Sequence, residues 1–181
     1  PEEMGGKRDD GLNLYEQVES TQTLLTHKDQ LDSVDLTTTK KVIGLFADEH
    51  LRDIEKPDNH TSEPATKEML DFAIKRSEAL MQNGCRGSFI MVEGSQVDWA
   101  GHANSIDYLV REMEDFEEAV VLAKSYAEQN NETLVLVTAD HETGGLLIEP
   151  LKPTAYTAPE VKFSYNTGIG YGSHTGVPVP V

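Results

Sequence analysis

Cysteine is almost absent from this 181-residue sequence, which has a single thiol at Cys85. No disulfide can therefore form within the chain, and a lone thiol is more often structural than catalytic. Long apolar runs are also absent, since no window approaches the roughly eighteen apolar residues of a membrane-spanning helix. The Gly-x-Ser-x-Gly motif is missing too, because Ser95 lies in "EGSQV". These absences disfavour a disulfide scaffold, a transmembrane protein and a metal-free serine hydrolase.

Basic residues are scarce: Lys and Arg total 15 against 32 Asp and Glu, which gives a net charge of −17. Such a chain repels nucleic acid and anionic lipid, so we expect neither as a partner. It would also repel an anionic substrate, unless bound cations reverse the charge locally. The hydrophobic content of 38% and the charged content of 26% are those of an ordinary globular protein.

The organisation along the chain predicts a single, partial α/β domain over residues 1–181. Residues 1–40 are expected to be a polar, irregular opening segment, and 41–150 a metal-binding β-α-β core. Residues 151–181 are expected to be irregular, with a strand that carries His174. Because the chain starts abruptly and ends inside the extended apolar stretch "GVPVPV", we expect it to be an excised fragment.

Local patterns predict one strand and one helix in the first half. "KVIGLF" at 41–46 is typical of a short buried strand. Ser62 is a candidate N-cap, with Pro64 in the first turn of a helix that runs to about Asn83. Gly84 then supplies a stop.

A second helix is flanked by two apolar segments. Apolar residues keep a three-four spacing over 105–129, which predicts a long amphipathic helix. "GSFIMV" at 87–92 and "TLVLVT" at 133–138 are typical of buried strands. Strand, helix and strand in this order predict parallel strands, so the expected fold class is α/β, a mostly parallel sheet with flanking helices.

Ionisable residues follow each of the two strands predicted around the long helix. Ligands bind beyond the carboxyl ends of parallel strands, so these residues are expected to meet at one edge. They are Glu93, Asp98, His102, Asp140 and His141. Mixed carboxylate and imidazole ligands favour zinc, and two such clusters side by side favour two zinc ions.

His174 is a candidate third ligand beside Asp98 and His102. Asp98 and His102 are four residues apart, so one helical turn places both on the same face. With His174 they form a set of three protein ligands that leaves a fourth position open for substrate. Trp99, between Asp98 and Ala100, either covers the edge of the site, contacts substrate or holds a water.

Three blocks of sequence resemble successive signature blocks of bacterial alkaline phosphatases. They are "VEGSQVDWAGHANS", "VTADHETGG" and "GSHTGVPVPV", in the same order and with similar spacing. "GGKRDDGLNL" and "KVIGLFADEH" resemble the family as well, so the likeness covers almost the whole chain.

The resemblance implies a ligand for each of three metal ions. It implies that the first zinc is bound by Asp98, His102 and His174. It implies that the second zinc is bound by Asp140 and His141, and that Glu93 is a magnesium ligand. Further implications are phosphate monoester substrates, a phosphoserine intermediate, a homodimeric full-length enzyme and a periplasmic or secreted location.

The chain departs from the family at the nucleophile. The family serine lies in an Asp-Ser-Ala context, and no such sequence is present; Ser33 in "LDSVD" is followed by Val34. The phosphate-binding arginine and further magnesium ligands of the family also lack a match. We therefore expect the C-terminal half of a catalytic domain, with weakened zinc binding and little or no turnover.

Two alternatives stay open beside the phosphomonoesterase. One is a related phosphodiesterase, sulfatase or phosphosugar mutase, which the magnesium-type Glu93 disfavours. The other is a catalytically dead zinc-binding or interaction module that keeps the ligands for stability. An upstream Asp-Ser-Ala in the parent reading frame would decide against the second alternative.

Overall fold

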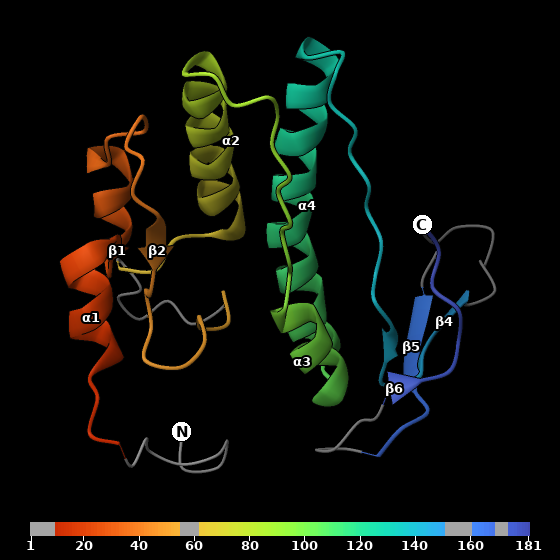
Figure 1. The fold of residues 1–181 in the computed structure, drawn as a ribbon. Helices are drawn as coiled ribbons and strands as arrows, with labels where there is room; N and C mark the ends of the chain where they lie inside the picture. The colour runs from red at the N-terminus through yellow and green to blue at the C-terminus, as the bar shows by residue number, and fades with distance from the viewer. Residues whose placement is uncertain (1–9, 55–61, 151–160, 169–173) are drawn as a thin grey trace. The chain divides into compact units, whose positions relative to one another are not determined.

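Figure 1 shows the computed structural model, which describes residues 10–54, 62–150, 161–168 and 174–181. The chain divides into two compact units. The first comprises Pro1–Arg52 and Lys56–Met91, and the second comprises Asp53–Glu55 and Val92–Val181. No helix in the described ranges is long and apolar enough to cross a membrane. The single partial domain over 1–181 stays a prediction.

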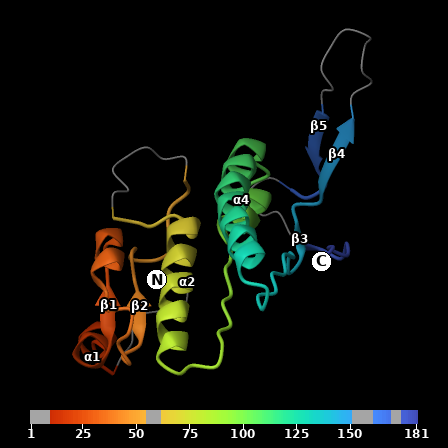
Figure 2. The same ribbon diagram turned by 90° about the horizontal axis from the view of Figure 1, so that it is seen from above.

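The first unit begins with a helix and a short parallel sheet. Helix α1 (Leu14–Thr21) is capped by Asn13, whose side chain accepts a hydrogen bond from the backbone N–H of Tyr15. Strand β1 (Thr23–Leu25) pairs in parallel with β2 (Val42–Gly44), and the 3-10 helix η1 (Lys28–Ser33) lies between them in sequence. Figure 2 shows the two strands side by side, with α2 next to β2.

In this region the structure confirms a predicted strand and contradicts the predicted irregular opening segment. The strand predicted at 41–46 is present as β2, over fewer residues. The segment 1–40, expected to be irregular, holds α1, β1 and η1 in its described part. The prediction was wrong there because all three elements are short: α1 is exposed along almost its whole length, and β1 has three residues, too few to show the apolar periodicity that marks longer elements.

Helix α2 (Thr66–Gln82) begins later than the sequence predicts. Its N-cap is Ala65 rather than Ser62, and the carboxylate of Glu68 accepts the Ala65 N–H at 2.8 Å. An acidic side chain in the third helical position can satisfy this N–H without a hydroxyl at the cap. The predicted stop is confirmed, since Gly84 follows the helix with a φ of +103°.

In its described residues, the second unit contains two helices and two antiparallel strand pairs. Its helices are α3 (Gln96–His102) and α4 (Ile106–Gln129), so the long helix predicted at 105–129 is confirmed. Its strands are β3 (Glu142–Thr143), β4 (Leu146–Pro150), β5 (Val161–Tyr165) and β6 (His174–Thr175). Strand β4 pairs with β5, and β3 pairs with β6. The described parts of 151–181 thus hold β5 and β6.

The mostly parallel sheet is not found among the described residues. Segments 87–92 and 133–138, predicted to be buried strands, run without strand pairing (Figure 1). Their apolar side chains are open to solvent: Phe89 is 92% exposed and Leu134 is 80% exposed. A strand exists only through hydrogen bonds to a neighbouring strand, which no local pattern supplies. The parallel pair that the described sheets contain is β1 with β2.

Polar side chains near the start of α4 are buried or half-buried. Glu112 is buried, and its carboxylate accepts the backbone N–H of Ile54 at 2.8 Å. Tyr108 donates its phenolic hydroxyl to the side-chain oxygen of Gln96. Burial, followed by the negative charges of Glu112 and Asp53, raises the pKa of Tyr108 from 10 to about 12.

We expect Tyr108 to ionise near pH 12, well above the usual range of a tyrosine. Because its pKa is raised in the folded state, its contribution to stability is complete below pH 10 and is lost as pH rises towards 12. Ultraviolet difference absorbance of tyrosinate should show a late step that Tyr108→Phe removes. A Tyr108→Phe titration with the late step still present would contradict this assignment.

Candidate metal centre

Helix α3 places two of the candidate ligands on one face. Asp98 and His102 lie one turn apart on this seven-residue helix, and Nε2 of His102 is 3.3 Å from Oδ2 of Asp98. The close approach of β3 to α3 depends on Gly101: a Cβ there would lie 2.9 Å from Cγ2 of Thr143. The "DWAGH" motif therefore supplies two candidate ligands and the space for the strand beside them.

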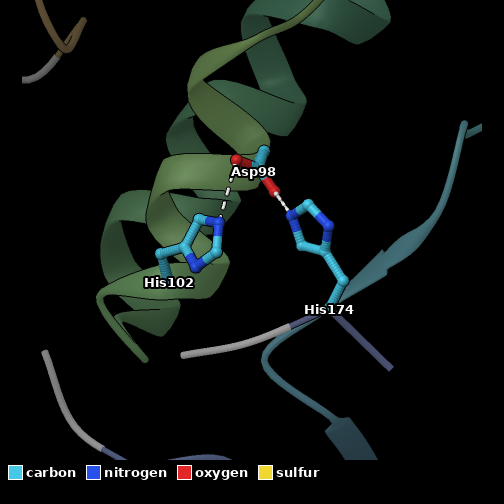
Figure 3. Close-up of side chains that lie close together, drawn as sticks. All are labelled: Asp98, His102 and His174. Carbon is cyan, nitrogen blue, oxygen red and sulfur yellow. Dashed lines mark hydrogen bonds and ion pairs between the residues drawn. The ribbon is translucent and has the colours of Figure 1, made fainter. Parts of the chain in front are cut away.

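Strand β6 brings the third candidate ligand from a distant part of the sequence. It pairs with β3 in the register Glu142↔Thr175 and Thr143↔His174. Nε2 of His174 then lies 3.2 Å from Oδ1 of Asp98, so both imidazoles face one carboxylate (Figure 3). One ligand atom from each of the three side chains lies within 4.8 Å of the others.

The donor set suits a zinc ion. One carboxylate oxygen and two imidazole nitrogens form a three-ligand set, which in catalytic zinc sites leaves the fourth position for water or substrate. The three donors are brought together by a helix and a paired strand, not by a single flexible loop. Geometry and ligand chemistry therefore both fit the sequence prediction for Asp98, His102 and His174.

Asp140 and His141 lie directly beside this group. Nε2 of His141 is 3.1 Å from Oδ2 of Asp140, and the side chain of Asp140 is 83% exposed. The His141 ring stacks on the His174 ring, with 3.5 Å between centroids. The two side chains thus contact each other, and His141 lies against His174 of the candidate group, while the role of the pair as metal ligands stays a prediction.

Sequence reasoning missed the two residues that follow this pair. The Glu142 carboxylate accepts the N–H of Leu146 at 3.0 Å and the hydroxyl of Thr175, and so connects both strands of the β3–β6 pair. Burial alone would raise the pKa of Glu142, but hydrogen bonds from Thr175, Leu146 and Gly145 lower it. Thr143 donates its hydroxyl to Asp98, the residue that both imidazoles of the candidate group face. The sequence "ADHETGG" could have indicated both residues, because it places an acidic and a hydroxyl side chain between the candidate ligand His141 and the glycines that follow.

Glu93 and Trp99 lie outside the three-residue ligand group. Glu93 is exposed, in the segment that precedes α3, and is not among the described side chains that could share one ion with Asp98. Trp99 follows Asp98 on α3 and is 43% exposed. The predicted roles of both residues stay predictions.

Comparison of the sequence with known proteins gives one family. A family model for alkaline phosphatase matches residues 1–168. Alkaline phosphatase 3 of Bacillus subtilis (strain 168) is 41% identical over 134 residues, which are 74% of this chain and 26% of that protein. Alkaline phosphatase of Escherichia coli (strain K12) is 30% identical over 162 residues, covering 77% of this chain and 34% of that protein. The chain thus spans about a quarter to a third of the length of these relatives.

Solved structures give the same result for the fold. A TAB5 alkaline phosphatase variant with magnesium bound in its M3 site superposes with a TM-score of 0.67 at 28% identity, covering 93% of this chain and 47% of that one. A cold-active alkaline phosphatase from a Shewanella species gives a TM-score of 0.64 at 33% identity, covering 82% of this chain and 35% of that one. With the family model matching over most of its length, the chain belongs to the alkaline phosphatase family.

Proposed function

We propose that this chain supplies metal ligands to the catalytic centre of an alkaline phosphatase that hydrolyses phosphate monoesters. The observation that carries the proposal is the convergence of Asp98, His102 and His174 within 4.8 Å. Membership of the alkaline phosphatase family supplies the reaction class. The chain covers about a quarter of its Bacillus relative, so the activity of the whole enzyme is part of the proposal.

The proposed centre holds two zinc ions and one magnesium ion. The first zinc is assigned to Asp98, His102 and His174, the second to Asp140 and His141, and the magnesium to Glu93. When bound, the ions would neutralise the phosphoryl group and stabilise the attacking and leaving oxygens. They would also reconcile a chain of net charge −17 with an anionic substrate.

Within this centre, the residues of this chain hold and orient the reacting groups. Asp98 is contacted by an imidazole at each of its oxygens, and it fixes where the first ligand set converges. The acceptor of the phosphoryl group in the proposed reaction is a serine, which becomes phosphoserine. No Asp-Ser-Ala sequence is present among these residues, so we propose that the chain is inactive by itself. We also propose that the whole enzyme is a homodimer located in the periplasm or outside the cell. This part of the proposal is supported by family membership alone.

Hydrolysis of a generic aryl phosphate by the purified 181-residue chain tests this proposal. With zinc and magnesium supplied, we expect bound zinc but no turnover above a chelator-treated control. Chelator-sensitive turnover would contradict the proposed inactivity and would place a nucleophile among these residues. Failure to bind zinc would contradict the proposed centre. A non-catalytic zinc-binding module would bind zinc in the same way. The parent reading frame distinguishes this module from the phosphatase, because an upstream Asp-Ser-Ala sequence identifies the enzyme.

A further inference from the structure

We infer that Thr143 is a positioning residue that couples the two groups of metal ligands; this inference rests on the proposed function. Its hydroxyl oxygen lies 2.6 Å from Oδ1 of Asp98 and 3.2 Å from Nδ1 of His141. Asp98 belongs to the first ligand group and His141 to the second. A single hydroxyl therefore contacts one ligand from each proposed zinc site.

The directions of these two hydrogen bonds follow from the number of protons. A threonine hydroxyl has one proton to donate, and an ionised carboxylate can only accept. Since Thr143 donates to Asp98, it must accept from His141, whose proton is then on Nδ1. In the neutral ring the lone pair is then on Nε2, which lies 3.1 Å from Oδ2 of Asp140; because both atoms are acceptors, this approach is favourable only when a proton or a metal ion lies between them. The free nitrogen therefore faces the partner ligand of the same proposed site.

The backbone and the methyl group of Thr143 hold its hydroxyl in place. In the β3–β6 register, Thr143 pairs with His174, and Nε2 of His174 faces Asp98. Its Cγ2 and Cβ lie against Gly101, where an added Cβ would meet them at 2.9 and 3.0 Å. With the side chain confined in this way, its hydroxyl can orient both ligands without rearrangement. Such outer hydrogen bonds fix the tautomer and the orientation of a metal-binding imidazole.

Two substitutions separate the hydroxyl from the methyl group. Thr143→Val removes the hydroxyl and keeps the methyl group that packs on Gly101. Thr143→Ser keeps the hydroxyl and removes the methyl group. Thr37→Val is the matched control, because the Thr37 hydroxyl also donates to an aspartate, Asp35, at 2.7 Å in the first unit.

The first readout is zinc affinity, measured by competition with a chromophoric chelator. We expect Thr143→Val to lower the affinity by about 10–100-fold, the usual effect of losing an outer hydrogen bond to a ligand. Thr143→Ser should stay within a few-fold of the original chain, and Thr37→Val should not differ from it. The second readout is the ring tautomer of His141 in the metal-free chain, from long-range proton–nitrogen NMR. We expect Thr143→Val to lower the share of the ring proton on Nδ1 and to raise the share on Nε2, which faces the carboxylate of Asp140.

Each result decides the inference. It is overturned if Thr143→Val keeps both the zinc affinity and the His141 tautomer, or if Thr143→Ser loses as much affinity as Thr143→Val. If Thr143→Val fails to fold, retention of affinity and tautomer in Thr143→Ser supports the role of the hydroxyl, and loss of both contradicts it. If the original chain binds no zinc, the proposed function fails, while the metal-free tautomer still tests the contact between Thr143 and His141.

Discussion

Asp98→Asn is expected to lower the zinc affinity of this chain by a factor of about 100–1,000. Zinc binding to four-ligand protein sites contributes about 10–16 kcal/mol, so each ligand accounts for roughly 2.5–4 kcal/mol. Asp98 is the common partner of the candidate group: His102 faces its Oδ2, and His174 and Thr143 face its Oδ1. The amide keeps the shape of the side chain but lacks the charge, and it replaces one oxygen acceptor with a donor.

Titration with zinc in the presence of a competing chelator measures this loss. The control is Asp107→Asn, which removes the same charge from an exposed position at the start of α4 in the second unit. Thermal unfolding without metal should be similar for the original chain and both variants. If Asp98→Asn retains the original affinity and stoichiometry, the zinc ion binds elsewhere.

Local patterns in the sequence predicted the two long helices of this fold, α2 and α4. The period of apolar residues over 105–129 is a property of neighbouring residues, and α4 (Ile106–Gln129) follows it closely. The spacing of Asp98 and His102 is also local, so a helical turn could be expected to align them, as α3 does. Segment 133–138 is different, because its apolar residues permit a strand but a strand requires a partner.

In the candidate site too, some residues could be identified from local sequence, whereas the roles of others depend on strand pairing. His141 was nominated from its residue type at the end of a predicted strand, and His174 as a third ligand beside Asp98 and His102; the two rings stack in the structure. The role of Thr143 depends on which atom of its side chain faces which neighbour, and that follows from the register of β3 with β6. Glu142 connects segments 33 residues apart through its bond to Thr175. Neither periodicity nor spacing contains that information.

Gly144→Ala is expected to destabilise the second unit by about 2–5 kcal/mol, through two separate effects. Gly144 has a φ of +87°, and left-handed backbone costs a residue with a Cβ roughly 1–2 kcal/mol. The added Cβ would also lie 2.8 Å from the carbonyl oxygen of Gly101 and 3.0 Å from the ring of Tyr165. Relieving such overpacking costs about 1–3 kcal/mol more. Unfolding in urea, followed by circular dichroism, measures the total.

Gly84→Ala separates the two effects, because Gly84 also has a positive φ, of +103°, but an added Cβ there meets nothing within 4 Å. Gly84→Ala should therefore show the backbone cost alone, and Gly144→Ala should exceed it by about 1–3 kcal/mol. Gly144 follows Thr143 and lies against Gly101 of the helix that carries Asp98 and His102, so we expect relief of the clash to disturb the hydrogen bond from Thr143 to Asp98. Gly144→Ala should consequently weaken zinc binding as well, whereas Gly84→Ala should not. Equal losses of stability in the two variants, with zinc binding unchanged, would mean that the β3–α3 contact does not hold the ligands in place.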